Sequence, residues 1–173
     1  SLTNCKNYRT CRTWKSCNNY IQKQLGRTFK MTNNCINRMN IKLPAISVNE
    51  GVARAIVSAF CAQLNPTIDE LADIKCAVSE AVTNCIVHAY RESSGEIYIS
   101  VKLYDNRKVK IEIKDKGCGI SDTELAKTPL YTTDNSGERS GMGFAVMESF
   151  MDKLTVKSTC DKGTTVIMKK TVK

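Results

Sequence analysis

Residues 79–90 read SEAVTNCIVHAY and carry three polar side chains at a spacing of four, namely Glu80, Asn84 and His88. Side chains at this spacing project from one side of a helix. Apolar residues in and before the segment recur every three or four positions and mark a different side, which predicts the core-facing stripe. That stripe consists of Leu71, Ile74, Val78, Ala81 and Cys85. The segment therefore predicts a long helix that packs on a core and has a separate polar face.

Glu80 has no basic neighbour on the adjacent turns of this helix. The residues three and four positions away are Cys76, Ala77, Thr83 and Asn84. Most helical glutamates are solvated surface groups, and that interpretation remains open here. A carboxylate and an amide among small and apolar residues are instead typical of a pocket wall. We therefore predict that Glu80 and Asn84 line a pocket, and we interpret His88 as a packing residue.

Three glycine-containing segments follow the helix: DKGCG at residues 115–119, SGMGF at 140–144 and KGTT at 162–165. A carboxylate followed by G-x-G at a strand end lets the backbone approach a ligand closely while the acid accepts a hydrogen bond from it. Ser140 can cap the next helix, whose first N–H groups suit a phosphate. Each segment alone is typical of an ordinary turn. In this order after Glu80 and Asn84, they form a joint signal.

The four elements resemble the sequence boxes of the GHKL ATP-binding superfamily, which includes histidine kinases, gyrase and mismatch-repair ATPases. Within it, the run from about Met39 to Lys170 resembles the anti-sigma factors of spore-forming bacteria. The similar segments are VNEGVARAIVSAFCAQLNPTIDELADIK, VSEAVTNCIVHAY, PLYTTD, ERSGMGFAVMESFMD and KGTTVIMKK. The resemblance implies an α/β fold: a Bergerat-type two-layer sandwich with a mixed, mostly antiparallel sheet and helices on one face.

The resemblance also implies a role for each site residue, with ATP and Mg²⁺ as cofactors. Asn84 would bind the metal, to which its neutral amide oxygen is suited. Glu80 would act as the catalytic base toward the attacking hydroxyl. Asp115 would accept the adenine amino proton, and Arg139 would neutralise the terminal phosphate. The other expected ATP contacts are Gly117, Gly119, Gly141, Met142, Gly143 and Thr165.

The implied function is that of an anti-sigma factor that inhibits a sporulation sigma factor and phosphorylates a serine of an anti-anti-sigma protein. A histidine kinase needs a phosphoacceptor on a separate dimerisation helix, whereas the single His of this chain lies on the nucleotide-binding helix. The resemblance therefore indicates a protein serine/threonine kinase, and a homodimer. A nucleotide-dependent sequestering module with little or no kinase activity remains the alternative.

The resemblance assigns partner binding to Arg54. The helix that carries it is expected to pack on the core through Val52, Ile56 and Phe60, so that Arg54 lies off the core stripe. A solvated helix charge is the other interpretation of Arg54.

The positive charge of the chain is concentrated at its start. The formal net charge of the 173 residues is +9, and residues 1–38 contain eight Lys or Arg and no Asp or Glu. We therefore expect a basic N-terminal extension over residues 1–38 that is dispensable, and an ATP-binding domain over residues 39–173. The alternative is that Trp14, Tyr20 and Phe29 pack on that domain. Because only about +1 remains for residues 39–173, we expect no direct DNA binding by the core.

Composition also bears on the cellular compartment. The nine cysteines are odd in number and match no zinc-ligand spacing, which favours a reducing, cytoplasmic location. No apolar run approaches the roughly 20 residues that a membrane-spanning helix needs, so we expect no membrane association.

Caps and periodicity predict the remaining elements. We expect helices at 47–64, 67–91 and 142–151, strands at 41–46, 96–104, 108–114, 154–159 and 164–171, and a loop at 128–140. Capping boxes begin at Ser47, Thr67 and Ser121.

Overall fold

Alternating apolar and polar residues build the centre of the sheet. Strands β2 (Glu96–Tyr104) and β3 (Lys108–Lys114) have the predicted bounds, and every second residue of each is buried. The computed structural model describes residues 34–90, 94–123 and 142–173. The chain divides into two compact units, Ser1–Thr32 and Asn33–Lys173, and all described residues belong to the second. The predicted loop at 128–140 lies outside the described residues.

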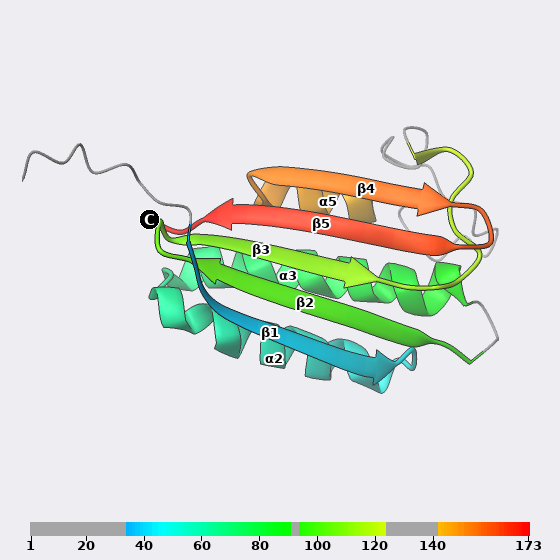
Figure 1. Ribbon diagram of the computed structural model, residues 1–173, viewed down its shortest axis with the longest axis horizontal. Coiled ribbons are helices and arrows are strands. Elements are labelled where there is room, and N and C mark those ends of the chain that lie inside the picture. The colour runs from blue at the N-terminus through cyan, green and yellow to red at the C-terminus, as the bar shows by residue number, and fades with distance from the viewer. Residues whose placement is uncertain (1–33, 91–93, 124–141) are drawn as a thin grey trace, which may run out of the picture. The chain divides into compact units, whose positions relative to one another are not determined.

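Five strands form one sheet in the order β1-β2-β3-β5-β4 (Figure 1). The other three strands are β1 (Cys35–Pro44), β4 (Lys153–Thr159) and β5 (Gly163–Thr171). All four pairings are antiparallel, where a mixed and mostly antiparallel sheet was expected. Two of the described α-helices lie between β1 and β2 in the chain, and β2 runs antiparallel to β1. β3 and β4 run in the same direction, but β5 lies between them (Figure 1).

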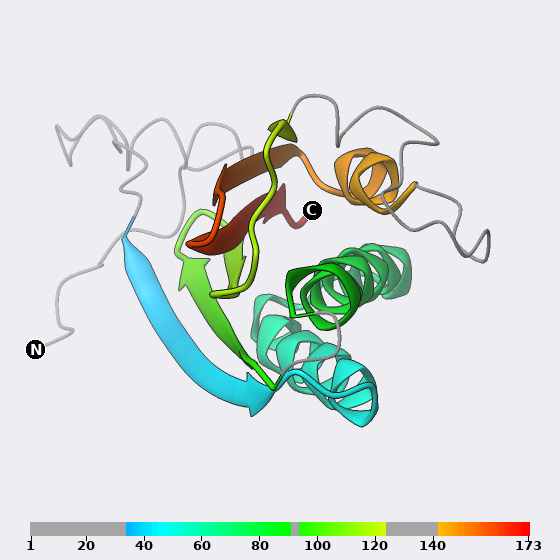
Figure 2. The same ribbon diagram turned by 90° about the vertical axis from the view of Figure 1, so that its right-hand side faces the viewer.

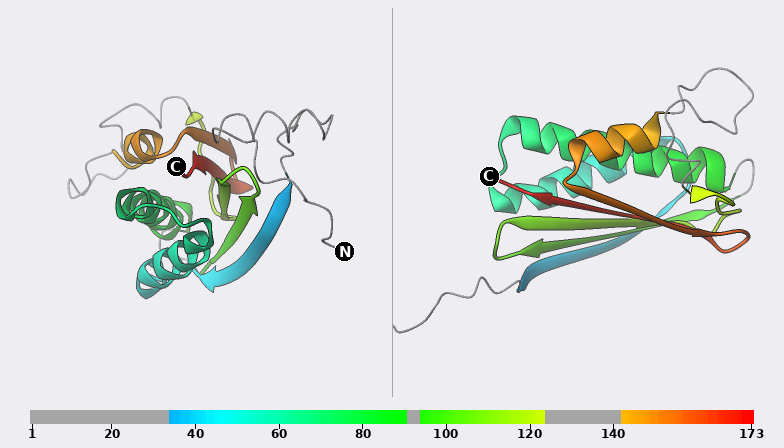
Figure 3. Two further views of the ribbon diagram at one scale, coloured as in Figure 1. Left: turned by 90° about the vertical axis from the view of Figure 1, so that its left-hand side faces the viewer. Right: turned by 90° about the horizontal axis from the view of Figure 1, so that it is seen from above.

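Within the described residues, three α-helices cover one face of this sheet (Figures 2 and 3). They are α2 (Val48–Cys61), α3 (Ile68–Asn84) and α5 (Gly143–Phe150). A 3₁₀ turn, η1 (Ala62–Leu64), follows α2, and a π-helix, η2 (Cys85–Ala89), follows α3. The predicted two-layer α/β sandwich with helices on one face is therefore confirmed.

The core lies between the two layers. Four of the five residues of the predicted α3 stripe are buried, and Leu71 packs against them. Burying one such aliphatic side chain contributes about 1.5–3 kcal/mol. The largest fully buried side chains are Ile74, Ile97, Ile99, Leu103, Ile111, Ile113, Met147 and Met168.

Of the predicted core stripe of α2, Phe60 packs against the core, but the prediction is wrong for Val52 and Ile56. Val52 and Ile56 are 41% and 36% exposed, whereas Ala53, Val57 and Cys61 are fully buried. Both sets recur every four residues, so periodicity alone did not decide which of them faces the core.

Two of the predicted capping boxes have opposite outcomes. Thr67 and Glu70 exchange both hydrogen bonds of a capping box, as predicted. Ser47 has helical dihedrals and makes no side-chain cap, and the carboxylate of Glu50 accepts a hydrogen bond from Ser79 on α3, at 2.5 Å. The box that begins at Ser121 includes Glu124, which lies outside the described residues.

Strand β1 begins at Cys35, four residues before the expected boundary at Met39. Arg38 pairs with Lys102 of β2, and the side chain of Asn37 donates a hydrogen bond to Gln63 at 2.7 Å. We therefore propose that the dispensable extension ends near Thr32.

A pair of truncated chains tests this boundary. A chain that begins at Asn33 should keep the free energy of unfolding of the full chain, whereas one that begins at Met39 loses part of β1. Each lost hydrogen bond costs about 0.5–1.5 kcal/mol, so we expect a deficit of roughly 1–3 kcal/mol in urea unfolding. A deficit already present in the chain from Asn33 would instead support packing of the extension on the domain.

Candidate functional site

Glu80 and Asn84 lie on one side of α3 and meet the start of α5. A Cβ atom built on Gly143 would lie 3.0 Å from Glu80 Oε2 and 3.5 Å from both amide atoms of Asn84. Both side chains are half-buried, and neither makes a side-chain hydrogen bond or ion pair within the part of the chain that the structure describes. The carboxylate and the amide are therefore available to a ligand beside Gly143.

The N-terminus of α5 adds hydrogen-bond donors to this cluster. Met142 occupies the N-cap position and makes no side-chain cap, so the first N–H groups of the helix have no capping partner from it. Such a terminus favours an anion, because its N–H groups and the helix dipole both point toward it. Arg139 and Gly141, predicted to lie nearby, are outside the described residues.

Asp115 is a buried carboxylate at the end of β3, with only 2% of its surface exposed. Its Oδ1 accepts hydrogen bonds from the backbone N–H groups of Gly117, at 2.9 Å, and Thr164, at 3.1 Å. Its Oδ2 lies 3.7 Å from the Cys85 thiol, which donates to it. A carboxylate oxygen has two acceptor positions, so Oδ2 can take a further hydrogen bond from a ligand.

The glycines after Asp115 let this loop pack against two backbone segments. A Cβ on Gly117 would collide with the carbonyl of Ala89 in η2, and Cys118 donates its backbone N–H to that same carbonyl at 2.9 Å. Gly119 has φ = +71°, and a Cβ there would collide with the carbonyl of Thr159. A π-helix at this point agrees with the frequent occurrence of such turns at functional sites.

The threonine beside Asp115 is Thr164, one position before the predicted Thr165. Thr164 is buried; its carbonyl accepts the backbone N–H of Asp115, and its own backbone N–H donates to the Asp115 carboxylate. Because side chains alternate along a strand, Thr165 projects from the opposite face of the sheet. The KGTT segment indicated which part of the chain lies beside Asp115. It did not indicate which of its two threonines faces Asp115, because the glycine turn before the strand leaves that choice open.

Two further residues that sequence reasoning missed hold this region in place. Ser158 Oγ lies 2.9 Å from Thr164 Oγ1 and accepts the backbone N–H of Ile120 at 2.7 Å. Tyr90 Oη accepts the backbone N–H of Lys116 at 2.8 Å. A hydroxyl residue on β4 and an aromatic after a helix are too common to signal such roles in a sequence.

Cys85 connects the two halves of the site. It follows Asn84 directly in the chain, and its thiol contacts Asp115. Burial and the neighbouring carboxylate of Asp115 raise the pKa of the Cys85 thiol well above its usual value. The thiol therefore stays protonated and neutral beside Asp115. His88, one turn on, accepts a hydrogen bond from the Cys118 thiol at its carbonyl, at 3.1 Å.

Arg54 lies at a second cluster, between α2 and α3. Its guanidinium is 3.4 Å from both Glu50 Oε1 and Ser79 Oγ. Its side chain is half exposed, so it remains accessible to another molecule. Ser79 directly precedes Glu80, which places the two clusters on neighbouring residues of α3.

The protein oxygen atoms of this site suit a metal ion whose remaining ligands are phosphate and water. Within the described ranges, no group of three or more His, Cys, Asp or Glu side chains could hold a metal ion. A Mg²⁺ ion typically uses one or two protein oxygens and completes its shell with phosphates and water. Asn84 supplies one such oxygen, so a phosphate-bound Mg²⁺ is compatible with the site.

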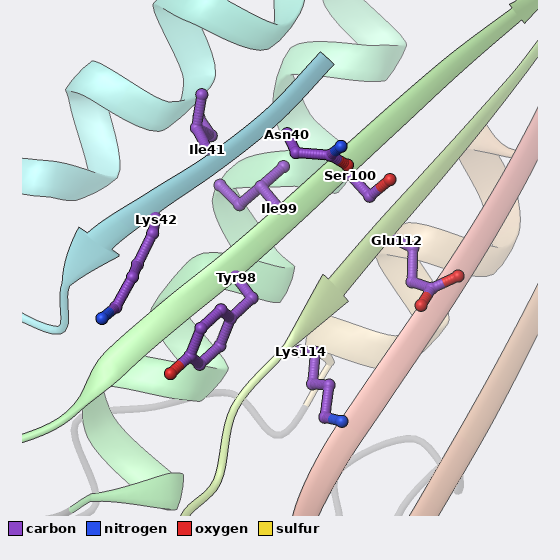
Figure 4. A pocket seen from close by; sticks show the side chains of 8 residues that line it. All are labelled: Asn40, Ile41, Lys42, Tyr98, Ile99, Ser100, Glu112 and Lys114. Atoms are coloured by element: carbon purple, nitrogen blue, oxygen red, sulfur yellow. The ribbon is translucent and has the colours of Figure 1, made fainter. Parts of the chain in front are cut away.

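A shallow hollow exists on the other face of the sheet and is separate from this site (Figure 4). It is lined by Asn40, Ile41, Lys42, Tyr98, Ile99, Ser100, Glu112 and Lys114.

Among the helices that the structure describes, none is long and apolar enough to span a membrane.

Comparison with known proteins agrees with this geometry. Residues 43–170 match the family model of the histidine kinase-like ATPase domain. The anti-sigma F factor of Caldanaerobacter subterraneus subsp. tengcongensis is 56% identical over 134 residues, which cover 78% of this chain and 93% of that protein. The anti-sigma F factor of Priestia megaterium is 52% identical over 135 residues, which cover 78% and 92%.

A solved structure of the RsbU and RsbW domains of a Mycobacterium tuberculosis protein has the same fold, with a TM-score of 0.58 at 21% identity. That match covers 79% of this chain and 32% of the other.

A matched pair of glycine substitutions tests the backbone geometry of the site. Gly119→Ala places a side chain at positive φ and against a carbonyl, so we expect a loss of at least about 2 kcal/mol in the free energy of unfolding. Gly51→Ala, in α2, has open space around the new Cβ and should gain roughly 0.5–1 kcal/mol. Equal urea midpoints for the two variants would contradict the conformation described for Gly119.

Proposed function

The chain belongs to the family of histidine kinase-like ATPase domains and, within it, to the anti-sigma F factors, and from this premise we propose that it is an ATP-dependent protein serine kinase. Its substrate is a serine of an anti-anti-sigma protein, and its second partner is a sporulation sigma factor, which it inhibits. One observation carries the kinase proposal: Glu80, Asn84 and the start of α5 converge on Gly143, and Cys85, the residue after Asn84, contacts the buried Asp115.

Asp115 recognises the adenine in this proposal. Its Oδ1 is occupied by two backbone N–H groups, and its Oδ2 accepts the hydrogen bond of the adenine amino group. The close packing of Gly117 and Gly119 against backbone keeps this loop thin, so that a flat base can lie against it. The neutral Cys85 thiol adds no charge beside the base.

Asn84 and the start of α5 hold the phosphates and the metal. Asn84 Oδ1 would be a protein ligand of Mg²⁺, which would neutralise charge on the phosphates when bound. The backbone N–H groups at Gly143 and the following residues donate to phosphate oxygens. Arg139 and Gly141 complete the phosphate site in this proposal.

Glu80 is the general base. It lies one turn before Asn84, and its carboxylate has no described partner that would neutralise it. It accepts the proton of the attacking serine hydroxyl as the bond between Oγ and the terminal phosphorus forms, and ADP leaves as the bond from that phosphorus to the bridging oxygen breaks. The serine belongs to the anti-anti-sigma protein in this proposal.

Partner binding falls on α2. Arg54 is the proposed contact to both the sigma factor and the anti-anti-sigma protein, and its half-exposed guanidinium supports this. Val48, Val52 and Ile56 form an exposed apolar stripe on the same helix, which supports a homodimer as the assembly. A protein that binds a sigma factor acts in the cytoplasm, where transcription takes place.

A nucleotide-dependent sequestering module without kinase activity is the second candidate. The free carboxylate of Glu80 beside Asn84 favours the kinase, because sequestration needs no base. Sigma-factor binding that requires ATP, with no phosphate transferred to the anti-anti-sigma protein, would favour the module.

Glu80→Gln should separate chemistry from binding. The amide keeps the shape of the side chain but cannot accept the proton, so phosphate transfer from labelled ATP should fall roughly 10²- to 10⁴-fold. ATP affinity in calorimetry should be unchanged. A wild-type transfer rate in this variant would remove Glu80 from the role of base.

Asp115→Asn serves as the comparison for Glu80→Gln, because it should weaken ATP binding, which Glu80→Gln should not. Replacing the acceptor by an amide that presents its NH₂ group costs a hydrogen bond to a charged group, about 1.5–3 kcal/mol, or roughly 10- to 150-fold in ATP affinity.

Arg54→Glu should weaken the binding of both partners while sparing ATP. An interface arginine commonly contributes about 2 kcal/mol or more, which is roughly 30-fold in affinity. Lys75→Glu reverses another exposed cation, on α3, and serves as the control. Equal effects of the two reversals on sigma-factor binding would show that net charge, rather than the Arg54 contact, was responsible.

A further inference from the structure

The register of the sheet aligns five cations in one row across all five strands. The row consists of Arg38 on β1, Lys102 on β2, Lys110 on β3, Lys169 on β5 and Lys153 on β4. Directly opposite residues project from the same face of a sheet. Lys102 lies between the buried Val101 and Leu103, so this face is the one that the helices do not cover.

The next two rows of the same face differ in charge. The row Asn40–Ser100–Glu112–Ile167–Thr155 contains no Lys or Arg, whereas the row Lys42–Tyr98–Lys114–Thr165–Lys157 contains three lysines. Of the fifteen positions in the three rows, eight are Lys or Arg and one, Glu112, is acidic. Figure 4 shows Lys42, Lys114 and Glu112 on this face. We call these fifteen positions the basic face.

The net charge of residues 39–173 is close to zero, although positive charge is concentrated on the basic face and negative charge elsewhere. Apart from the basic face, these residues contain 11 Lys or Arg and 16 Asp or Glu, a net charge of −5. The expectation that the core does not bind DNA rested on the sum. The structure shows that the charges are separated in space.

The row of five cations is unfavourable for the isolated protein. Like charges directly opposite each other on a sheet destabilise it. Lys110 is paired with Glu112 at 3.1 Å, but within the described part of the chain the other four cations of the row have no ion-pair partner. An anionic partner would remove this repulsion.

The shape and chemistry of the basic face indicate which anion fits. Adjacent strands are about 4.8 Å apart, so the row spans roughly 19 Å. Duplex DNA carries one charge per roughly 1.7 Å of axis, enough to face the whole row. Single strands bind largely by stacking bases on aromatic rings. Here Tyr98 is covered by Lys42 and Lys116, whose Nζ atoms lie 5.7 and 5.0 Å from its ring centre.

We propose that the basic face binds the phosphate backbone of a nucleic acid duplex, through the row from Arg38 to Lys153. The contacts are electrostatic and independent of base sequence, because a cation that contacts a phosphate carries no information about the base. This surface lies on the opposite side of the sheet from Glu80 and Asn84, so binding there leaves the nucleotide site accessible.

Three variants of the full chain test the proposal, with a labelled 20-base-pair duplex and fluorescence anisotropy. Lys102→Gln with Lys169→Gln removes two charges of the row. Lys75→Gln with Lys173→Gln removes two exposed charges at the helical layer and is the matched control, which keeps any contribution of residues 1–32 constant. Lys102→Arg with Lys169→Arg keeps the charge of the row.

We expect the row variant to bind the duplex about tenfold or more weakly near 0.1 M salt, and its log–log salt slope to be shallower by about 1.8. The control and the arginine variant should match the unmodified chain. ATP affinity should be unchanged in all three, which separates this outcome from a failure of the nucleotide site. Equal losses in the row and control variants would overturn the proposal. So would binding of poly-glutamate or anionic vesicles as tight as that of the duplex.

Discussion

The buried carboxylate of Asp115 is the constraint on which the rest of the site depends. An ionised group inside a protein is costly unless hydrogen bonds compensate it. Two backbone N–H groups do so here, and they come from the loop after β3 and from the start of β5. The same requirement seats the thiol of Cys85 against the carboxylate, and with it the end of the helix that carries Asn84. One charge therefore fixes three separate segments around a ligand position.

The sequence was sufficient where local chemistry decides the structure. Alternation along β2 and β3 gave their bounds, and Thr67 with Glu70 marked the start of α3. It was insufficient where a distant group competes. Glu50 accepts a hydrogen bond from Ser79, on another helix, and Ser47 forms no side-chain cap. The threonine beside Asp115 is Thr164 because the turn before β5 determines which alternate residues of that strand face Asp115. No local sequence pattern specifies this choice.

The exposed stripe of α2 and the basic face have one cause in common. A periodic pattern shows which residues share a side of an element, but it does not show what lies opposite that side. Val52 and Ile56 share a side of their helix, and that side is open. Lys102 and Lys169 share a row only because the strand order β2-β3-β5 brings them together. Counting charges along the chain loses this information, since it ignores distance in space.

The π-helix at Cys85–Ala89 has a consequence for how such chains can vary in length. A π-turn holds one residue more than an α-turn, and the carbonyl of Ala89 at its end accepts the backbone N–H of Cys118. Deleting one residue there would shift this carbonyl relative to the loop after Asp115. The number of residues in this turn, and not only their identity, therefore positions that loop.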